Sequence, residues 1–332
     1  MPSCAPILIH PSQFPQTWRK ELLASFRHRS INHKFHYDSV KQAQKWIALH
    51  QAFSPANIDT SCRAMYRQAL ASVAARWGRR KAHVISLGCG SGAKDAMLLH
   101  ALRINRNWVT YTPCDASAPL VVTAWARMHK ELSASREIEG VVCDLAMAKD
   151  LDAVFRQQAP PGTSRLVLFF GMIPNFEPDA ILPRLAKLVR KSDWLLMSAN
   201  LAPGSDYEKG MRHVLPSYDN ALTRDWLQTL LWDVGVERDD GDAEFSIEKK
   251  SGLRRIVCHY RFRRSRKLWI GPEVFHFARG ETIRLFYSYR YTQDVLERVA
   301  KKHGLSVVDA WLAPSGEEGV FLCRRAASGS PQ

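Results

Sequence analysis

The chain has 332 residues, 46% of them hydrophobic, so it can bury a core as one large domain or two moderate ones. Its net charge of +15 permits a nucleic-acid partner without establishing one. No apolar run is long enough to span a membrane and no signal peptide is evident at the N-terminus, so we expect a cytoplasmic protein.

The seven cysteines are scattered along the chain. They form no C-x-x-C pair, which argues against a zinc site. We therefore expect reduced, mostly buried thiols and no bound metal.

Residues 1–75 carry little strand signal, and we predict helices there. The first strong motif is HVISLGCGSG at 83–92, a buried strand that leads into a turn with Gly88, Gly90 and Gly92 at alternate positions. Helix formers follow, so a helix N-terminus would face an anionic or zwitterionic ligand. A dinucleotide fingerprint is G-x-G-x-x-G, whereas this compact spacing resembles the first motif of class I S-adenosylmethionine-dependent methyltransferases.

Four further strands are predicted, and the first two end in the acids Asp115 and Asp144. These strands span 109–115, 140–144, 165–171 and 193–201. Strands that alternate with helices indicate an α/β fold with a parallel, doubly wound sheet and a ligand at the carboxyl ends of its strands. An acid at Asp115 can accept hydrogen bonds from both ribose hydroxyls, although a helix N-cap is the alternative role.

An insertion interrupts the expected order of such a sheet. It begins at Pro203-Gly204, continues through a helical segment and becomes β-like from 245 to 289. The core then resumes with a helix and two strands, at 305–312 and 319–324. The predicted organisation is a helical N-terminal part of the substrate domain (1–75), a methyltransferase core (76–202 and 290–325), an inserted α+β lid (203–289) and an unstructured tail (326–332).

The basic run RRIVCHYRFRRSRK at 254–267 supports an alternative, an enzyme that modifies RNA and tracks its phosphates. Apolar residues interleave with the basic ones, as in a half-buried strand with a solvated face. The segment FGMIPNF at 170–176 also lacks the D/N-P-P-Y/F box typical of enzymes that methylate base amines. A nucleic-acid partner is thus the less favoured reading.

From about residue 33 to 325 the chain resembles the histidine Nα-methyltransferases of ergothioneine biosynthesis. The most specific matches are KFHYDS (34–39), LGCGSGAK (87–94) and FFGMIPNFEP (169–178). The resemblance implies a class I methyltransferase core, S-adenosylmethionine as methyl donor and a small-molecule amine as acceptor. It implies that Gly88 and Lys94 lie at the methionine end of the donor, Asp115 on the ribose and Asp144 by the adenine. A lysine one turn into the helix can pair with the donor carboxylate, although it could equally be a solvated helix residue.

On the acceptor side, the resemblance implies that Asn175 holds the α-amino or carboxylate end of an amino acid and that Tyr37 closes over it. Ser288 would lie beside the acceptor side chain. A tyrosine of the family corresponds to Tyr218 by local sequence or to Arg212 by ungapped alignment. A neutral amine is needed for methyl transfer, and Tyr37, Asp219 and a water are candidates for its general base.

Two positions depart from the family pattern. Phe286 stands where the family has a glutamate that accepts a hydrogen bond from imidazole, and Val257 where it has a methionine. An apolar ring cannot accept the hydrogen bond that a buried carboxylate accepts from an imidazole N–H. We therefore predict a monomeric N-methyltransferase for the α-amine of an amino acid or related metabolite other than histidine, an aromatic amino acid fitting best. Histidine itself, and a non-catalytic binding protein on the same scaffold, are the alternatives.

Overall fold

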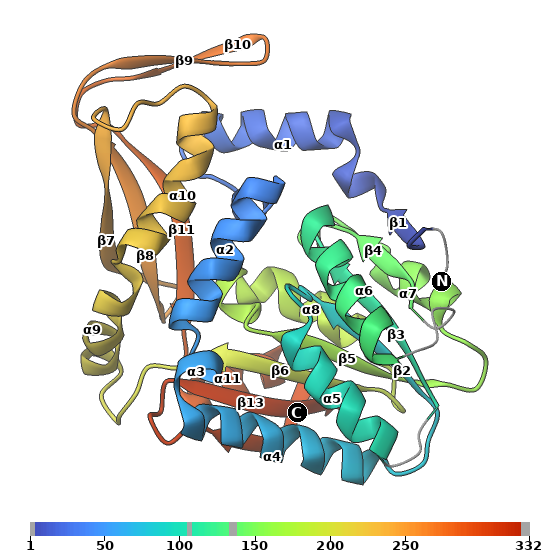
Figure 1. Cartoon of the computed structure of the whole chain (residues 1–332). Helices are drawn as coiled ribbons and strands as arrows, with labels where there is room; N and C mark the ends of the chain where they lie inside the picture. The colour runs from blue at the N-terminus through green and yellow to red at the C-terminus, as the bar shows by residue number, and fades with distance from the viewer. Residues whose placement is uncertain (1–3, 105–107, 133–137, 327–332) are drawn as a thin grey trace.

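The computed structural model describes residues 4–104, 108–132 and 138–326. Its largest unit is an eight-stranded sheet that is parallel except at β13, which runs antiparallel to both of its neighbours (Figure 1). The strands, in sheet order, are β1 (Ile7–Ile9), β4 (Gly140–Val142), β3 (Val109–Asp115), β2 (Ala82–Leu87), β5 (Ser164–Phe170), β6 (Trp194–Asn200), β13 (Glu318–Arg325) and β12 (Leu305–Leu312). This is the predicted α/β, doubly wound class I methyltransferase sheet.

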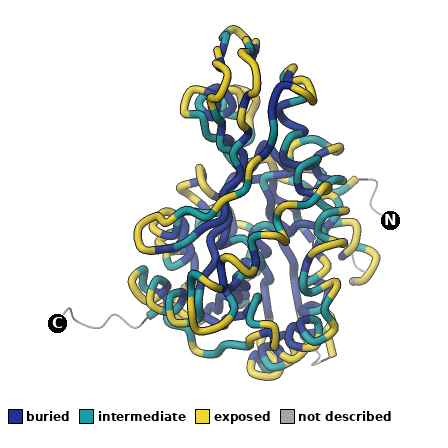
Figure 2. The backbone as a smooth tube through the Cα atoms, turned by 90° about the vertical axis from the view of Figure 1, so that its left-hand side faces the viewer, coloured by how far each residue is buried: buried dark blue, intermediate teal, exposed yellow. Residues whose placement is uncertain are grey.

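Helices cover both faces of this sheet, which is why its central strands read as continuous apolar runs. Along β5, Leu166 and Leu168 pack with the helices of one face, and Val167 and Phe169 with those of the other. The first face carries α4 (Thr60–Trp77), α5 (Ala93–Ile104) and α6 (Ala118–Leu132); the second carries α7 (Leu151–Gln158), α8 (Pro178–Leu188) and α11 (Gln293–Lys302). The tube in Figure 2 shows these strands as the buried centre of the molecule.

A second, antiparallel sheet belongs to the insertion and has the order β11-β8-β7. Its strands are β7 (Gly241–Lys250), β8 (Leu253–Phe262) and β11 (Thr282–Arg290), and a hairpin of β9 (Arg266–Ile270) and β10 (Glu273–Phe277) projects beyond them (Figure 1). One apolar cluster joins this sheet to α10 (Ala221–Asp233) and to two N-terminal helices, α1 (Pro15–Arg27) and α2 (Val40–Phe53). The helix α9 (Tyr207–Tyr218) packs on β7 and β8. N-terminal segments thus share a core with the inserted lid.

Two parts of the N-terminal region differ from the sequence prediction. The strand β1 was missed, although it pairs in parallel with β4 at the edge of the central sheet. It has only three residues, all partly or fully exposed, and so shows no periodicity. In addition, α4 packs on the central sheet, whereas a boundary at residue 75 assigns most of this helix to the substrate domain. The remaining domain division stays a prediction.

The lid connects to the central sheet through the end of β11. Directly after that strand, Tyr291 bridges to Leu201, the residue that follows β6. The Tyr291 amide donates to the Asn200 carbonyl (3.2 Å), and the Ala202 amide donates to the Tyr291 carbonyl (2.8 Å). This junction brings β11 to the carboxyl ends of the parallel strands. No helix among the described residues is long and apolar enough to cross a membrane.

Candidate active site

A cavity of about 690 Å³ lies between the carboxyl ends of the central strands and the lid. All predicted site residues except Gly92 and Val257 line it. These residues are Tyr37, Gly88, Gly90, Lys94, Asp115, Asp144, Asn175, Tyr218, Phe286 and Ser288. The fold therefore gathers residues from the N-terminal segment, the glycine turn and the lid around one space large enough for a donor and an acceptor.

The glycine turn shapes one wall of the cavity. Gly88 and Gly90 have φ of 73° and 52°, the left-handed region that glycine adopts readily. A Cβ would lie 2.3 Å from Met172 Sδ at Gly88 and 2.8 Å from the Trp46 ring at Gly90. Gly92 serves packing instead, because its Cβ would meet the Ala124 backbone of α6 at 3.2 Å. Its assignment to cofactor binding is therefore corrected.

Asp115 lies at the end of β3 and faces the glycine turn. Its carboxylate accepts hydrogen bonds from the Gly90 amide (3.2 Å) and the Ser117 amide (3.0 Å). Burial raises the pKa of Asp115 to about 6. A buried carboxylate with two amide donors and unused lone pairs suits the hydroxyls of a ribose.

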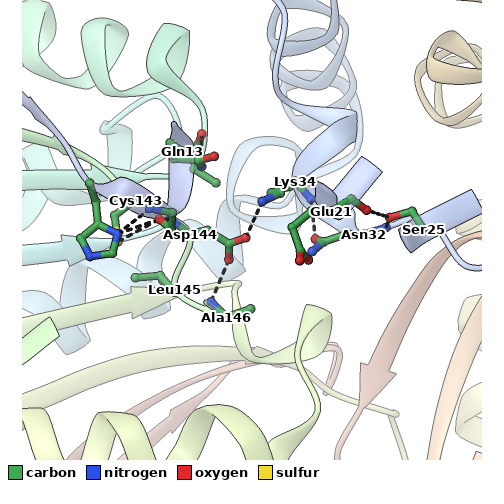
Figure 3. A network of polar contacts seen from close by, with 12 residues as sticks. Gln13, Glu21, Ser25, Asn32, Lys34, Cys143, Asp144, Leu145 and Ala146 are labelled. Atoms are coloured by element: carbon green, nitrogen blue, oxygen red, sulfur yellow. Dashed lines mark hydrogen bonds and ion pairs between the residues drawn. The ribbon is translucent and has the colours of Figure 1, made fainter. Parts of the chain in front are cut away.

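Asp144 follows β4 and forms a buried ion pair. Its Oδ2 atom lies 2.9 Å from Lys34 Nζ, and its Oδ1 atom accepts the Ala146 amide at 2.8 Å (Figure 3). Both charged side chains are almost fully buried. Lys34 precedes Tyr37 in the N-terminal segment, so the pair holds that segment against the adenine end of the predicted donor site.

Lys94, in the first turn of α5, is held by a second polar cluster. Its Nζ atom donates to Tyr66 OH (2.7 Å) and to Glu318 Oε1 (3.2 Å), and Tyr66 OH also donates to that carboxylate. Lys94 and Glu318 both line the cavity. A cation and an anion side by side fit the carboxylate and ammonium of a methionine moiety. Lys94 is thus a half-buried, paired residue and not a freely solvated lysine.

Aromatic rings form the lid side of the cavity. Phe286 stacks on His33 with 5.0 Å between ring centroids and meets Trp226 edge-on at 6.0 Å. Only 7% of Phe286 is exposed. The Tyr287 amide donates to His33 Nε2 (3.2 Å), and burial lowers the pKa of His33 well below its usual value, so this ring is neutral at pH 7. The rings of Phe286, His33 and Trp226 in this part of the wall therefore carry no charge.

Polar groups meet next to this wall. Tyr218 OH lies 3.1 Å from Ser288 Oγ and accepts a hydrogen bond from Arg290 Nε at 3.2 Å. Arg212, the other candidate for this position, is exposed and pairs with Glu208. Tyr218 therefore lines the cavity, whereas Arg212 does not.

Tyr37 and Asn175 line the cavity between the donor and acceptor ends. The Tyr37 ring packs against Trp226 at 5.3 Å, and Ser117 Oγ donates to the Tyr37 carbonyl at 2.6 Å. Asn175 ends a short 3-10 helix, η4 (Ile173–Asn175), that follows β5. This arrangement lets both side chains reach an amine held at the centre of the cavity.

Two predictions about side chains at this site need correction. Burial and the nearby Asp115 carboxylate raise the pKa of Tyr37, so its phenol stays protonated at neutral pH and is no general base. Asp219 is no better as a base, because it pairs with Arg224 (2.6 Å) and lies outside the cavity. A water is the candidate that remains.

Val257, predicted to contact the acceptor, faces away from it. In the β8–β11 ladder, Val257 pairs with Tyr287, whereas Phe286 and Ser288 pair with Cys258 and Ile256. Because side chains alternate along a strand, Val257 points to the opposite face. It is fully buried and does not line the cavity.

The basic run at 254–267 is largely neutralised within the lid. Arg261 pairs with Glu244 (2.8 Å), Arg264 with Glu237 (3.0 Å), and Arg263 with Asp242. These partners explain the charge pattern as exposed ion pairs within the lid, of which Arg261–Glu244 joins the strands β8 and β7. The arrangement gives no support to an RNA-tracking strip.

Sequence reasoning missed several residues of the site, namely His33, Lys34, Tyr66, Trp226, Arg290 and Glu318. Lys34 begins the matched segment KFHYDS, so a signal existed for it. The other residues reach the cavity through tertiary packing, which a single sequence does not reveal.

The parallel sheet with its antiparallel β13, the glycine turn and the acids after β3 and β4 define a class I S-adenosylmethionine-dependent methyltransferase. A family model described as a histidine-specific, S-adenosylmethionine-dependent methyltransferase matches residues 18–325. The chain belongs to this family.

Two curated relatives agree with this assignment. The N-methyltransferase fsqC of Aspergillus fumigatus is 24% identical over 249 residues, covering 71% of this chain and 64% of the relative. The histidine N-alpha-methyltransferase of Mycolicibacterium smegmatis is 26% identical over 252 residues, covering 73% of this chain and 75% of the relative. The chain thus spans less than two thirds of the fungal relative. A solved S-adenosylmethionine-dependent methyltransferase from Clostridium acetobutylicum superposes with a TM-score of 0.45 and 10% identity, covering 86% of this chain and 99% of that one.

Proposed function

We propose that this protein methylates the α-amine of an amino acid whose side chain is aromatic. The observation that carries the proposal is Phe286, which is buried in the cavity wall between His33 and Trp226. Aromatic rings prefer the edge and offset contacts that such a wall offers. The wall has no carboxylate at this position to accept a hydrogen bond from an imidazole.

The donor end fits S-adenosylmethionine. The turn at Gly88 and Gly90 would border the ligand, Asp115 would hold the ribose, Asp144 would lie by the adenine, and Lys94 would bind the methionine carboxylate. When bound, S-adenosylmethionine supplies a methyl group already activated by its sulfonium. The protein therefore needs to orient the amine and exclude water, and no metal is required for this reaction.

The acceptor end can present a neutral amine. Asn175 and Tyr37 are uncharged hydrogen-bonding groups, so they can orient a nitrogen without fixing it as an ammonium. Burial also disfavours the charged form and lowers the pKa of an amine. A water can carry the released proton away, since neither Tyr37 nor Asp219 is a suitable base.

Histidine is the second candidate, because the matched family is described as histidine-specific and both Asn175 and Ser288 line the cavity. The deciding experiment incubates the protein with S-adenosylmethionine and each of the proteinogenic amino acids and detects methylated products by mass spectrometry. We expect tryptophan, tyrosine or phenylalanine to be the preferred acceptor. Preferred methylation of histidine would contradict the role given to Phe286. A monomeric state and a cytoplasmic location are also proposed.

A further inference from the structure

Three arginines among the described residues are almost fully buried, and one of them differs from the others. Arg165 pairs with Asp152 at 2.7 Å, and Arg255 pairs with Glu248 at 2.8 Å. Arg290, which is only 6% exposed, forms no ion pair with any residue that the structure describes. A buried guanidinium without a counterion is costly, so a partner from outside the chain is expected.

The contacts of Arg290 fix its orientation but leave one end unused. Its Nε donates to Tyr218 OH (3.2 Å), and its Nη1 donates to the carbonyls of Leu201 (2.8 Å) and Glu317 (3.3 Å). These acceptors are all neutral. Within the described chain Nη2 has no hydrogen-bond partner, and the side chain lines the cavity. The head group is thus held in place with donors to spare.

We infer that Arg290 binds the carboxylate of the amino-acid acceptor. The planar fork of a guanidinium matches a carboxylate, and a charge-assisted hydrogen bond in a buried cavity is strong. Tyr218 OH lies beside this head group and shares a hydrogen bond with Ser288 Oγ, so one of these two hydroxyls keeps a proton to donate to the same carboxylate. Arg290 would therefore select acceptors that carry an acid next to the amine.

The position of Arg290 favours the acceptor over the donor as its ligand. Arg290 ends β11, the strand that also carries Phe286 and Ser288. The donor end already has a cation of its own in Lys94, at the glycine turn. The inference rests on the proposed function, because it requires an amino acid at the lid side of the cavity.

Pairing with Arg290 also serves the reaction. A free carboxylate next to an amine favours the ammonium form, which has no lone pair to attack a methyl group. A guanidinium that neutralises the carboxylate removes this effect. Arg290 thus acts as a substrate-binding residue that also helps to keep the amine neutral.

The test compares an acid with its matched amine. With S-adenosylhomocysteine at saturation, titration calorimetry measures the binding of L-tryptophan and of tryptamine, which lacks the carboxylate, and repeats this with L-phenylalanine and phenethylamine. We expect wild-type protein to bind the acid about 10- to 100-fold more tightly than the amine. In Arg290→Met this preference should fall to near parity, and Arg290→Lys should restore part of it.

Arg255→Met is the matched control, because it removes a buried guanidinium from the neighbouring strand outside the cavity. It should lower the melting temperature yet keep the preference for the acid. Equal binding of acid and amine by wild-type protein, or an unchanged preference in folded Arg290→Met, would overturn the inference and leave the proposed function intact. If neither acid nor amine binds, the aromatic acceptor and the role of Arg290 both fail.

Discussion

Lys34 Nζ lies 2.9 Å from Asp144 Oδ2, which joins the N-terminal segment to the carboxyl end of β4. The same segment carries His33 and Tyr37, which line the cavity. One ion pair therefore ties the residue proposed to lie by the adenine to a segment that lines the rest of the cavity. A carboxylate has about four lone-pair sites, so Asp144 can keep Lys34 and still accept a hydrogen bond from the adenine amino group.

Breaking this pair should destabilise the protein. In Lys34→Met, the Asp144 carboxylate stays buried without its cation, which costs about 3–5 kcal/mol. Chemical denaturation followed by fluorescence measures the change in the free energy of unfolding. The double variant Lys34→Met/Asp144→Asn should recover part of the loss, because no lone charge remains. A loss below about 1 kcal/mol in Lys34→Met would show that the pair is solvated in solution.

Donor binding should depend on pH through Asp115. The pKa of Asp115 in the folded protein, about 6, lies above the ordinary value of 3.8, so folding favours the protonated carboxyl. In the ligand-free protein this group therefore stabilises the fold below about pH 4, and the stabilisation is lost as pH rises from about 4 through 6. The hydroxyls of a bound ribose favour the ionised form, so affinity for S-adenosylhomocysteine should fall as pH drops below about 6. Calorimetry between pH 5 and 8 measures this slope, at most about tenfold per pH unit.

Two variants identify the group behind that slope. Asp115→Asn should bind weakly and lose the dependence on pH between 5 and 7. Asp95→Asn is the control, because burial raises the pKa of Asp95 to about 6 as well. The Asp95 carboxylate already accepts a hydrogen bond from Tyr111 OH at 2.5 Å and is not proposed to bind the ribose. Asp95→Asn should keep the slope. A slope that survives in Asp115→Asn would assign it to another group.

Replacing Phe286 by glutamate should move acceptor preference towards histidine. The new carboxylate can accept a hydrogen bond from an imidazole N–H, and the loss of the ring removes contacts with an aromatic side chain. We expect the ratio of kcat/KM for histidine to that for tryptophan to rise about 100-fold. Phe286→Leu is the control and should weaken tryptophan turnover without gaining histidine turnover. Competition between the two amino acids, read by mass spectrometry, gives the ratio directly.

Asn175→Ala should slow methyl transfer without weakening donor binding. The amide that orients the amine is lost, and one hydrogen bond to a reacting group corresponds to about a 10- to 100-fold fall in kcat/KM. Binding of S-adenosylhomocysteine should change by less than about twofold, because the residues proposed to hold the donor lie at or after the ends of β2, β3 and β4 and at the start of α5. A parallel loss in both measurements would instead indicate that Asn175 shapes the donor site.

The donor half of the site could be predicted because its residues follow strands directly. Gly88, Asp115 and Asp144 come at the ends of buried apolar runs, and parallel strands bring such ends to one edge of a sheet. The missed strand β1 shows the limit of this signal. Its three apolar residues, two exposed and one partly buried, are too few to show an alternating pattern, and only their pairing with β4 makes them a strand.

The acceptor half was predictable only in part. Phe286 and Ser288 could be placed by resemblance, but Val257 required the register of two strands that lie far apart in sequence. A shift in strand register by one residue turns a side chain to the other face of the sheet. Because β8 is almost fully buried on both faces, its sequence pattern does not indicate which side chains point to the cavity. Trp226 and Glu318 reach the cavity only through the packing of α10 and of β13.

The bridge between Tyr291 and Leu201 restricts how this enzyme can change its acceptor. Because β11 runs from the acceptor wall straight into backbone hydrogen bonds with the end of β6, the distance between the lid wall and the central sheet is set by main-chain atoms. A new acceptor of another size must then be accommodated by exchanging side chains at positions such as Phe286. The lid backbone is thus held at a fixed distance from the central sheet, and the shape of the cavity changes through substitution of single side chains.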